Sequence, residues 1–189
     1  MAEPQKRARR QQATIVFIDE SGFRLQPLNR RTWSPRGITP VQRVWDRHDR
    51  LSVIAAVTLS PQRQQISTPF AMRSRNIVTT DVVSFVKRLR RQLRRPLIVI
   101  LDRWSVHRAA VKRLQAEGVS GLEFAWLPAY APELNPVESL WGWSKYSDLA
   151  NYVPDDTPRL QAVVRRSLWK PRRRPQLKRS FFHAAKLRL

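Results

Sequence analysis

The chain contains no cysteine, few acidic residues and no long apolar run. The absence of cysteine from its 189 residues excludes disulfides, thiolate zinc sites and cysteine nucleophiles, and it fits a reducing compartment. No apolar stretch approaches the roughly 20 residues that a membrane-spanning helix needs. Residues 1–12 are basic but lack the apolar region of a secretory signal. We therefore expect a cytoplasmic protein without a membrane partner.

Positive charge is what the chain has in excess. It has 36 Lys and Arg residues against 14 Asp and Glu residues, which gives a formal net charge of +22. Such a surface attracts polyanions and raises the rate of encounter with DNA or RNA. The length and a hydrophobic fraction of 42% are sufficient for one domain with a substantial core. The composition favours a globular protein that binds nucleic acid.

The order of the expected elements indicates a mixed α/β sheet. Strands are expected at residues 14–18, 42–45, 51–59, 97–101 and 122–127, and helices at 80–95, 106–117, 136–149 and from 157. The early strands are joined by short links, which favours antiparallel pairing, and the later ones alternate with helices, which favours parallel crossovers. We expect five strands with helices on both faces.

The two ends of the chain are expected to differ from this body. Residues 1–13 are polar and basic, and we expect a flexible lead there. Residues 156–189 are expected to form a basic C-terminal helix and tail, with Phe181 and Phe182 as anchors. The catalytic body would then span residues 14–155.

Three carboxylates occupy positions where a fold can gather them. Asp19 and Asp102 each follow a short apolar run, and Glu138 lies at the start of an expected helix. Ligands of α/β sheets collect beyond the carboxyl ends of the strands. Phosphodiester chemistry can use two Mg²⁺ ions roughly 3.5–4 Å apart, and Mg²⁺ prefers carboxylate oxygens. The pattern predicts Asp19, Asp102 and Glu138 as metal ligands and catalytic residues.

Each acid also has a structural interpretation. An Asp after a strand often only caps a turn. Asn135 suits a helix N-cap and Pro136 the first helical position, so Glu138 falls where a capping box has its acid. Glu20, beside Asp19 on a strand, would point to the opposite face and is the weaker candidate.

Further residues are candidates for contact with DNA. His107 lies near a helix start, where it could touch substrate, tune the site or be structural. Lys145 lies two helical turns after Glu138 and could contact a phosphate or be a solvated lysine. Trp104, beside Asp102, is the tryptophan that we expect to touch DNA. Basic residues at 87–95 and 165–179 are candidates for backbone contacts, which position DNA without reading its sequence.

Three segments of the sequence resemble the catalytic blocks of a known family. They are residues 17–23, Leu101 to His107 and residues 127–141, and 35 residues separate Asp102 from Glu138. Together they resemble the DDE transposases of the mariner superfamily, in particular its bacterial insertion-sequence branch. The similarity covers about residues 14–155.

This resemblance implies a ribonuclease H-like fold with Asp19, Asp102 and Glu138 as the metal-binding catalytic residues. It implies cleavage at transposon ends that depends on two Mg²⁺ ions, which Mn²⁺ can replace, followed by attack of the freed 3′-hydroxyl on target DNA. It further implies a homo-oligomer on DNA, acting at the bacterial nucleoid.

Two departures from the family pattern bear on activity. Arg103 stands directly after the second Asp, where the family usually has Asn; its guanidinium could repel cations or contact DNA. Relatives have an N-terminal helix-turn-helix region, whereas about a dozen residues precede the first expected strand here. We expect either the second frame of a split element, with a separately encoded helix-turn-helix part, or a decayed remnant. The alternatives are an inactive DNA-binding remnant and a ribonuclease H-like repair or recombination nuclease.

Overall fold

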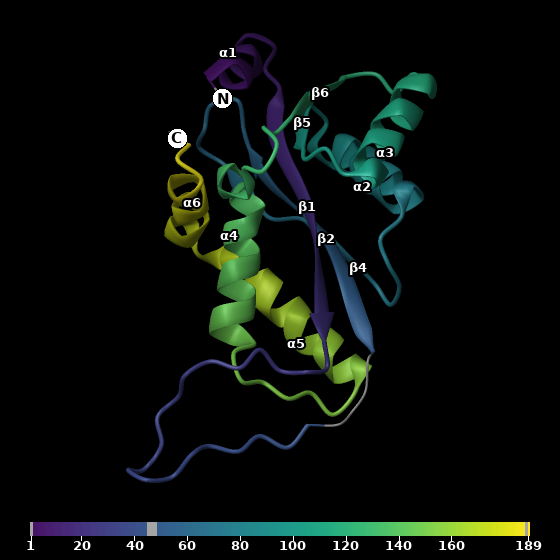
Figure 1. Cartoon of the computed structure of the whole chain (residues 1–189). Helices are drawn as coiled ribbons and strands as arrows, with labels where there is room; N and C mark the ends of the chain where they lie inside the picture. The colour runs from purple at the N-terminus through teal and green to yellow at the C-terminus, as the bar shows by residue number, and fades with distance from the viewer. Residues whose placement is uncertain (1, 45–48, 188) are drawn as a thin grey trace.

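The computed structural model describes residues 2–44, 49–187 and 189 (Figure 1). The strands are β1 (Thr14–Arg24), β2 (Arg50–Leu59), β3 (Ile66–Ser67), β4 (Phe70–Arg73), β5 (Leu97–Leu101) and β6 (Leu122–Trp126). The α-helices are α1 (Ala2–Arg10), α2 (Thr79–Leu93), α3 (Ser105–Ala116), α4 (Pro136–Trp143), α5 (Thr157–Trp169) and α6 (Pro175–Ala184). Shorter helical turns are η1 (Pro132–Leu134), the π-helical η2 (Ser144–Asp148) and η3 (Lys170–Arg173).

The sheet has the mixed topology that the sequence predicts. Its strand order is β3-β2-β1-β5-β6, and β4 also pairs with β2. β1 runs antiparallel to β2 and parallel to β5, and β5 runs parallel to β6. β1 and β5 pair as far as Phe17 opposite Ile100, so the chain positions that follow them emerge at the same edge of the sheet.

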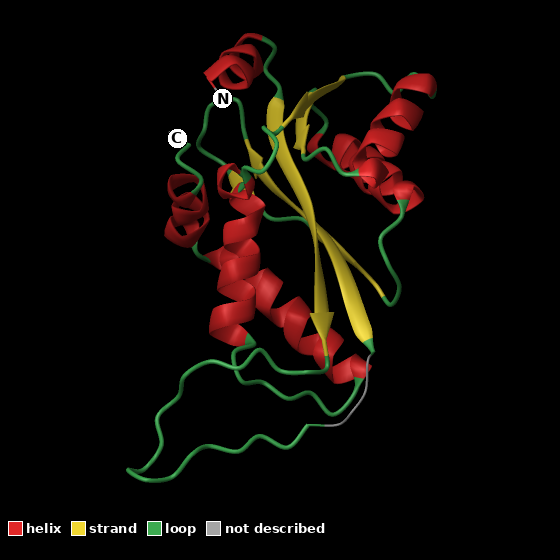
Figure 2. Ribbon diagram, viewed as in Figure 1, coloured by secondary structure: helices red, strands yellow, loops and turns green. Residues whose placement is uncertain are grey.

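Helices cover both faces of the sheet (Figure 2). Alternate residues of β1 point to opposite faces. Val16 and Ile18 pack in one core cluster with residues of α2 and α3, whereas Ile15 and Phe17 pack in the other with residues of α4, α5 and α6. Phe182 of α6 is 1% exposed and meets Phe17 edge-on at 6.1 Å, so the expected anchor of the C-terminal region is confirmed.

Several expectations differ from the structure. The lead expected to be flexible forms α1 instead, and its Ala8 is 2% exposed against the core. Residues 42–44 form no strand, because they lie exposed in a long extended segment and pair with none of the strands that the structure describes (Figure 1). Position 45 lies outside the described residues. The sheet has six strands rather than five, because β3 and β4 are too short to be seen in the hydrophobic pattern. The helix expected to run from 136 to 149 is α-helical only to Trp143.

None of the helices in the described part of the chain is both long and apolar enough to cross a membrane.

Candidate active site

Three separate elements bring Asp19, Asp102 and Glu138 to one cleft of about 380 Å³. Asp19 lies in β1, Asp102 directly follows β5, and Glu138 lies in the first turn of α4. Asp19 has the same parity along β1 as Ile15 and Phe17, which places it on the face covered by α4. The parallel pairing of β1 with β5 brings Asp19 and Asp102 to the same edge of the sheet.

The capped start of α4 fixes the backbone of Glu138, whose side chain makes no cap of its own. The Asn135 side chain accepts a hydrogen bond from the Val137 N–H at 3.1 Å, and Pro136 occupies the first helical position, as the sequence predicts. The Asn135 N–H donates to the Pro132 carbonyl at 2.9 Å rather than to the Glu138 carboxylate. The capping-box interpretation of Glu138 is therefore not realised, and its carboxylate faces the cleft.

The Asp19 carboxylate is in an unfavourable environment for a negative charge. Burial, followed by the charges of Glu138 and Glu20, raises the pKa of Asp19 from 3.8 to about 7. The Trp141 indole N–H donates to Asp19 Oδ2 at 2.9 Å and favours the charged form, but it does not offset the other effects. Burial and the charge of Asp102 also raise the pKa of Glu138, against the opposing charge of Lys145. A cation in the cleft would relieve this repulsion.

Asp102 is tied to its surroundings through one oxygen. Its Oδ1 accepts a hydrogen bond from the Trp104 N–H at 2.9 Å and lies 2.5 Å from His107 Nδ1. His107 is 0% exposed, and its Nε2 lies 2.8 Å from Glu20 Oε2. Burial alone would lower the pKa of His107, but hydrogen bonds and charges from Glu20 and Asp102 raise it to about 9. The fully buried ring has no exposed surface for a DNA contact, and its two nitrogens face Asp102 and Glu20 instead.

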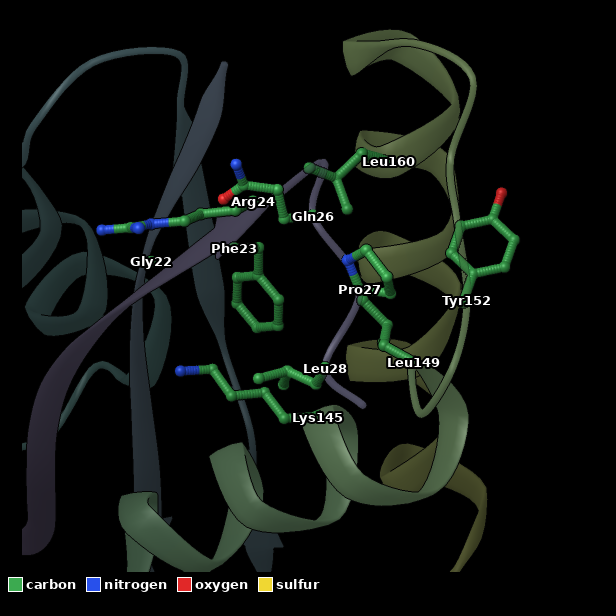
Figure 3. Close-up of a pocket in the computed structure, with 10 residues that line it drawn as sticks. All are labelled: Gly22, Phe23, Arg24, Gln26, Pro27, Leu28, Lys145, Leu149, Tyr152 and Leu160. Carbon is green, nitrogen blue, oxygen red and sulfur yellow. The ribbon is translucent and has the colours of Figure 1, made fainter. Parts of the chain in front are cut away.

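Lys145 lines an apolar cavity of about 280 Å³ (Figure 3). Its Nζ lies over the Phe23 ring, 5.4 Å from the centroid. Burial lowers the pKa of Lys145, and the charges of Glu138 and Asp19 oppose this shift. The lysine is half-buried rather than fully solvated, and it lies within the electrostatic reach of the cleft.

The two residues after Asp102 differ in their placement. Arg103 lines the same cleft as the three acids and is exposed. Trp104 is 44% exposed and lines a separate cleft of about 650 Å³ on the other side of β1, with Arg24 and Arg50 among the other residues that line it. Its ring also meets His107 edge-on at 5.5 Å.

The donor set of the acidic cleft fits Mg²⁺ or Mn²⁺. Across residues 2–44, 49–187 and 189, no group of three or more His, Cys, Asp or Glu side chains is close enough to share one ion. Mg²⁺ does not require that, because it keeps several waters and is bound through one or two carboxylates together with substrate phosphates. Asp19, Asp102 and Glu138 supply such oxygen ligands around one cleft.

Two residues of the site have a larger part than the sequence indicates. Glu20 is the weaker candidate by strand parity because it points away from Asp19, yet it reaches the site through His107. Trp141 donates to Asp19; it ends the block of residues 127–141, but no role of its own is predicted for it from the sequence. Its position three residues after Glu138 on the same helix places both on one face, which is the signal that could have indicated it.

Comparison with known proteins identifies the family of this chain. The family model described as DDE superfamily endonuclease matches residues 14–161, which is most of the chain. The chain belongs to this family. No curated protein matches the sequence.

Solved structures agree with the fold of a DDE endonuclease. The chain superimposes on the mariner Mos1 paired-end complex with Mg with a TM-score of 0.59 and 17% identity, covering 100% of this chain and 61% of that one. A pre-cleavage Mos1 transpososome matches with a TM-score of 0.58, 16% identity and the same coverage. The Mos1 strand transfer complex matches with a TM-score of 0.57 and 16% identity, covering 98% and 58%. The ribonuclease H-like fold is confirmed, and the chain spans about three fifths of the length of these Mos1 chains.

Proposed function

We propose that this DDE endonuclease domain is the catalytic part of a transposase. It cleaves DNA at transposon ends and joins the freed 3′-hydroxyl to target DNA, with Asp19, Asp102 and Glu138 holding two Mg²⁺ or Mn²⁺ ions. The observation behind this is the meeting of three carboxylates from β1, the end of β5 and the start of α4 in one cleft. Membership of the DDE superfamily endonucleases supports the reaction class.

The residues of the cleft have distinct tasks in this reaction. Bound Mg²⁺ supplies activation of the attacking oxygen and stabilisation of the leaving oxygen. Asp19 is held by the Trp141 N–H and Asp102 by the Trp104 N–H, while the capped start of α4 fixes the backbone of Glu138. Rigid ligands of this kind hold the reacting groups in place, which is a large part of phosphoryl-transfer catalysis.

DNA is the partner that the charge of the chain favours. The net charge of +22 attracts the phosphate backbone. Arg103 in the acidic cleft, Lys145 beside it and the exposed Trp104 are the contacts that we propose near the reacting strand. One of the similar structures is a Mos1 paired-end complex with the left transposon end, which supports transposon ends as substrate and a homo-oligomer on DNA. A separately encoded helix-turn-helix part would recognise the ends, in the nucleoid of a bacterial cytoplasm.

Substitution of each acid tests the proposal. Asp19→Asn, Asp102→Asn and Glu138→Gln should each abolish nicking of supercoiled plasmid in Mg²⁺ or Mn²⁺, while DNA affinity in a gel-shift assay stays unchanged. Glu133→Gln is the matched control, because Glu133 is exposed in η1 and does not line the cleft. Nicking by any of the three variants at the parental rate would refute the assignment.

Arg103 gives a specific reason to test a second function. A guanidinium among the acids adds positive charge where a cation should bind, so an inactive DNA-binding remnant is the competing candidate. Salt-sensitive DNA binding without metal-dependent cleavage in the parent would favour the remnant, and recovery of cleavage in Arg103→Asn would identify Arg103 as the cause.

A further inference from the structure

The His107 ring joins Glu20 of β1 to Asp102, which directly follows β5. Glu20 has the same parity along β1 as Val16 and Ile18, which pack against α2 and α3, whereas Asp19 belongs to the face of α4. His107 lies near the start of α3, and its ring contacts both Glu20 and Asp102. Its Nε2 is 2.8 Å from Glu20 Oε2, and its Nδ1 is 2.5 Å from Asp102 Oδ1.

Asp102 needs such a contact to have a fixed orientation. It follows the last residue of β5, in the short link before α3, and its side chain is 52% exposed. Both hydrogen bonds that hold it, from the Trp104 N–H and from His107, end on Oδ1. Oδ2 accepts no hydrogen bond from a residue that the structure describes, and it is the oxygen left for a cation.

Glu20 holds the other side of the ring without reaching the acidic cleft. Its side chain is 12% exposed, and His107 is the partner of its Oε2. Its Oε1 is buried and has no hydrogen-bond partner among the described residues. A buried carboxylate with an unpaired oxygen destabilises the fold, so stability alone does not explain why Glu20 is there.

We propose that Glu20 and His107 are positioning residues that fix the Asp102 carboxylate for cation binding, without touching the cation or DNA themselves. This inference rests on the proposed function, because it takes Asp102 to be a metal ligand. Removal of a residue that hydrogen-bonds to a metal ligand and orients it typically lowers metal affinity or activity by about 10–100-fold. The competing explanation is a buried ion pair that serves stability alone.

Two substitutions at Glu20 separate these explanations. Glu20→Gln can still hydrogen-bond to Nε2 of His107, whereas Glu20→Ala releases that side of the ring. Direct titration of Mn²⁺ into the metal-free protein, followed by electron paramagnetic resonance without DNA, gives the dissociation constant. We expect Glu20→Ala to weaken Mn²⁺ binding by about 10–100-fold and Glu20→Gln by less than about threefold. Equal losses in the two variants would make Glu20 a ligand rather than a positioning residue and would overturn the inference.

A variant could bind Mn²⁺ weakly because it is unfolded rather than because Asp102 is misoriented, and a double variant separates these two causes. Replacement of both partners by apolar residues, Glu20→Leu with His107→Leu, leaves no unpaired buried charge and should preserve the fold. This double variant should bind Mn²⁺ as weakly as Glu20→Ala, and parental Mn²⁺ affinity in its folded form would overturn the inference. His183→Ala, at an exposed position of α6, is the control for the removal of a histidine.

Asp102→Asn distinguishes failure of this inference from failure of the proposed function. If Asp102→Asn binds Mn²⁺ like the parent, Asp102 is not a metal ligand, and both the proposed function and the positioning role of Glu20 and His107 are wrong. If Asp102→Asn loses Mn²⁺ while Glu20→Ala and the double variant retain it, the positioning role alone is wrong.

Discussion

Removal of the charge of Asp19 should stabilise the metal-free protein. Its pKa is raised from 3.8 to about 7 by burial and by the charges of Glu138 and Glu20, so the folded state binds a proton that the unfolded state has released. Between these two pH values the folded state therefore loses stability as the pH rises, with a slope of about 1.4 kcal/mol for each pH unit. Over that whole pH range the slope gives an upper limit of about 4 kcal/mol for the stability that ionisation of Asp19 removes. Structural relaxation around the charged carboxylate should reduce this loss of stability to about 2 kcal/mol.

Asp19→Asn tests this magnitude because the amide oxygen can still accept from the Trp141 N–H. In urea unfolding with EDTA, the free energy of unfolding of the variant should equal that of the parent near pH 4. At pH 8 it should be higher than that of the parent by about 2 kcal/mol. Mg²⁺ at 100 times its dissociation constant should stabilise the parent by about 2.7 kcal/mol and the variant much less. Glu133→Gln, an exposed acid, should show neither effect. A destabilised Asp19→Asn protein, or a difference that does not depend on pH, would refute the reasoning.

Three further predictions follow from other contacts. Asp81 accepts hydrogen bonds from Arg73, Arg75 and the Val78 N–H; burial opposes its ionisation, but the arginines lower its pKa. Because both arginines are partly exposed, Asp81→Asn should cost about 1–2 kcal/mol at neutral pH in urea unfolding, and the cost should shrink as the pH falls below the ordinary pKa near 4. Arg103→Asn should strengthen Mn²⁺ binding by several-fold in a titration, since it removes a positive charge from the cleft. Trp104→Ala should weaken binding of single-stranded DNA by about 1–3 kcal/mol, measured by fluorescence anisotropy.

The part of the site that the sequence predicts is the part set by local periodicity and strand order. The apolar runs before Asp19 and Asp102 indicate buried strands, and alternation with helices indicates their parallel pairing, which the structure contains. The cap at Asn135 follows from local chemistry and places Glu138 at a helix start. These features depend on neighbours in the chain, so a single sequence is enough to predict them.

The rest depends on contacts that no local pattern encodes. Strand alternation predicts that Glu20 faces away from Asp19, but only the placement of α3 shows that His107 connects Glu20 to Asp102. The strand expected at residues 42–45 fails over 42–44 for the same reason, because β-forming side chains need a partner strand and no strand of the described residues pairs with them. The expectation of a flexible lead at α1 is wrong because it follows from basic charge alone, although the segment is rich in good helix formers.

The pairing of β1 with β5 also bears on how the molecule is made. The 72 residues from 25 to 96 separate these strands, so their alignment closes a long loop, whereas β1 and β2 can pair earlier as nearer neighbours. On the ribosome, Asp19 emerges long before Asp102 and meets it only after β5 has been synthesised and docked. Affinity for divalent cations should therefore be acquired late in folding, and the rate at which it appears would report the docking of the central parallel pair.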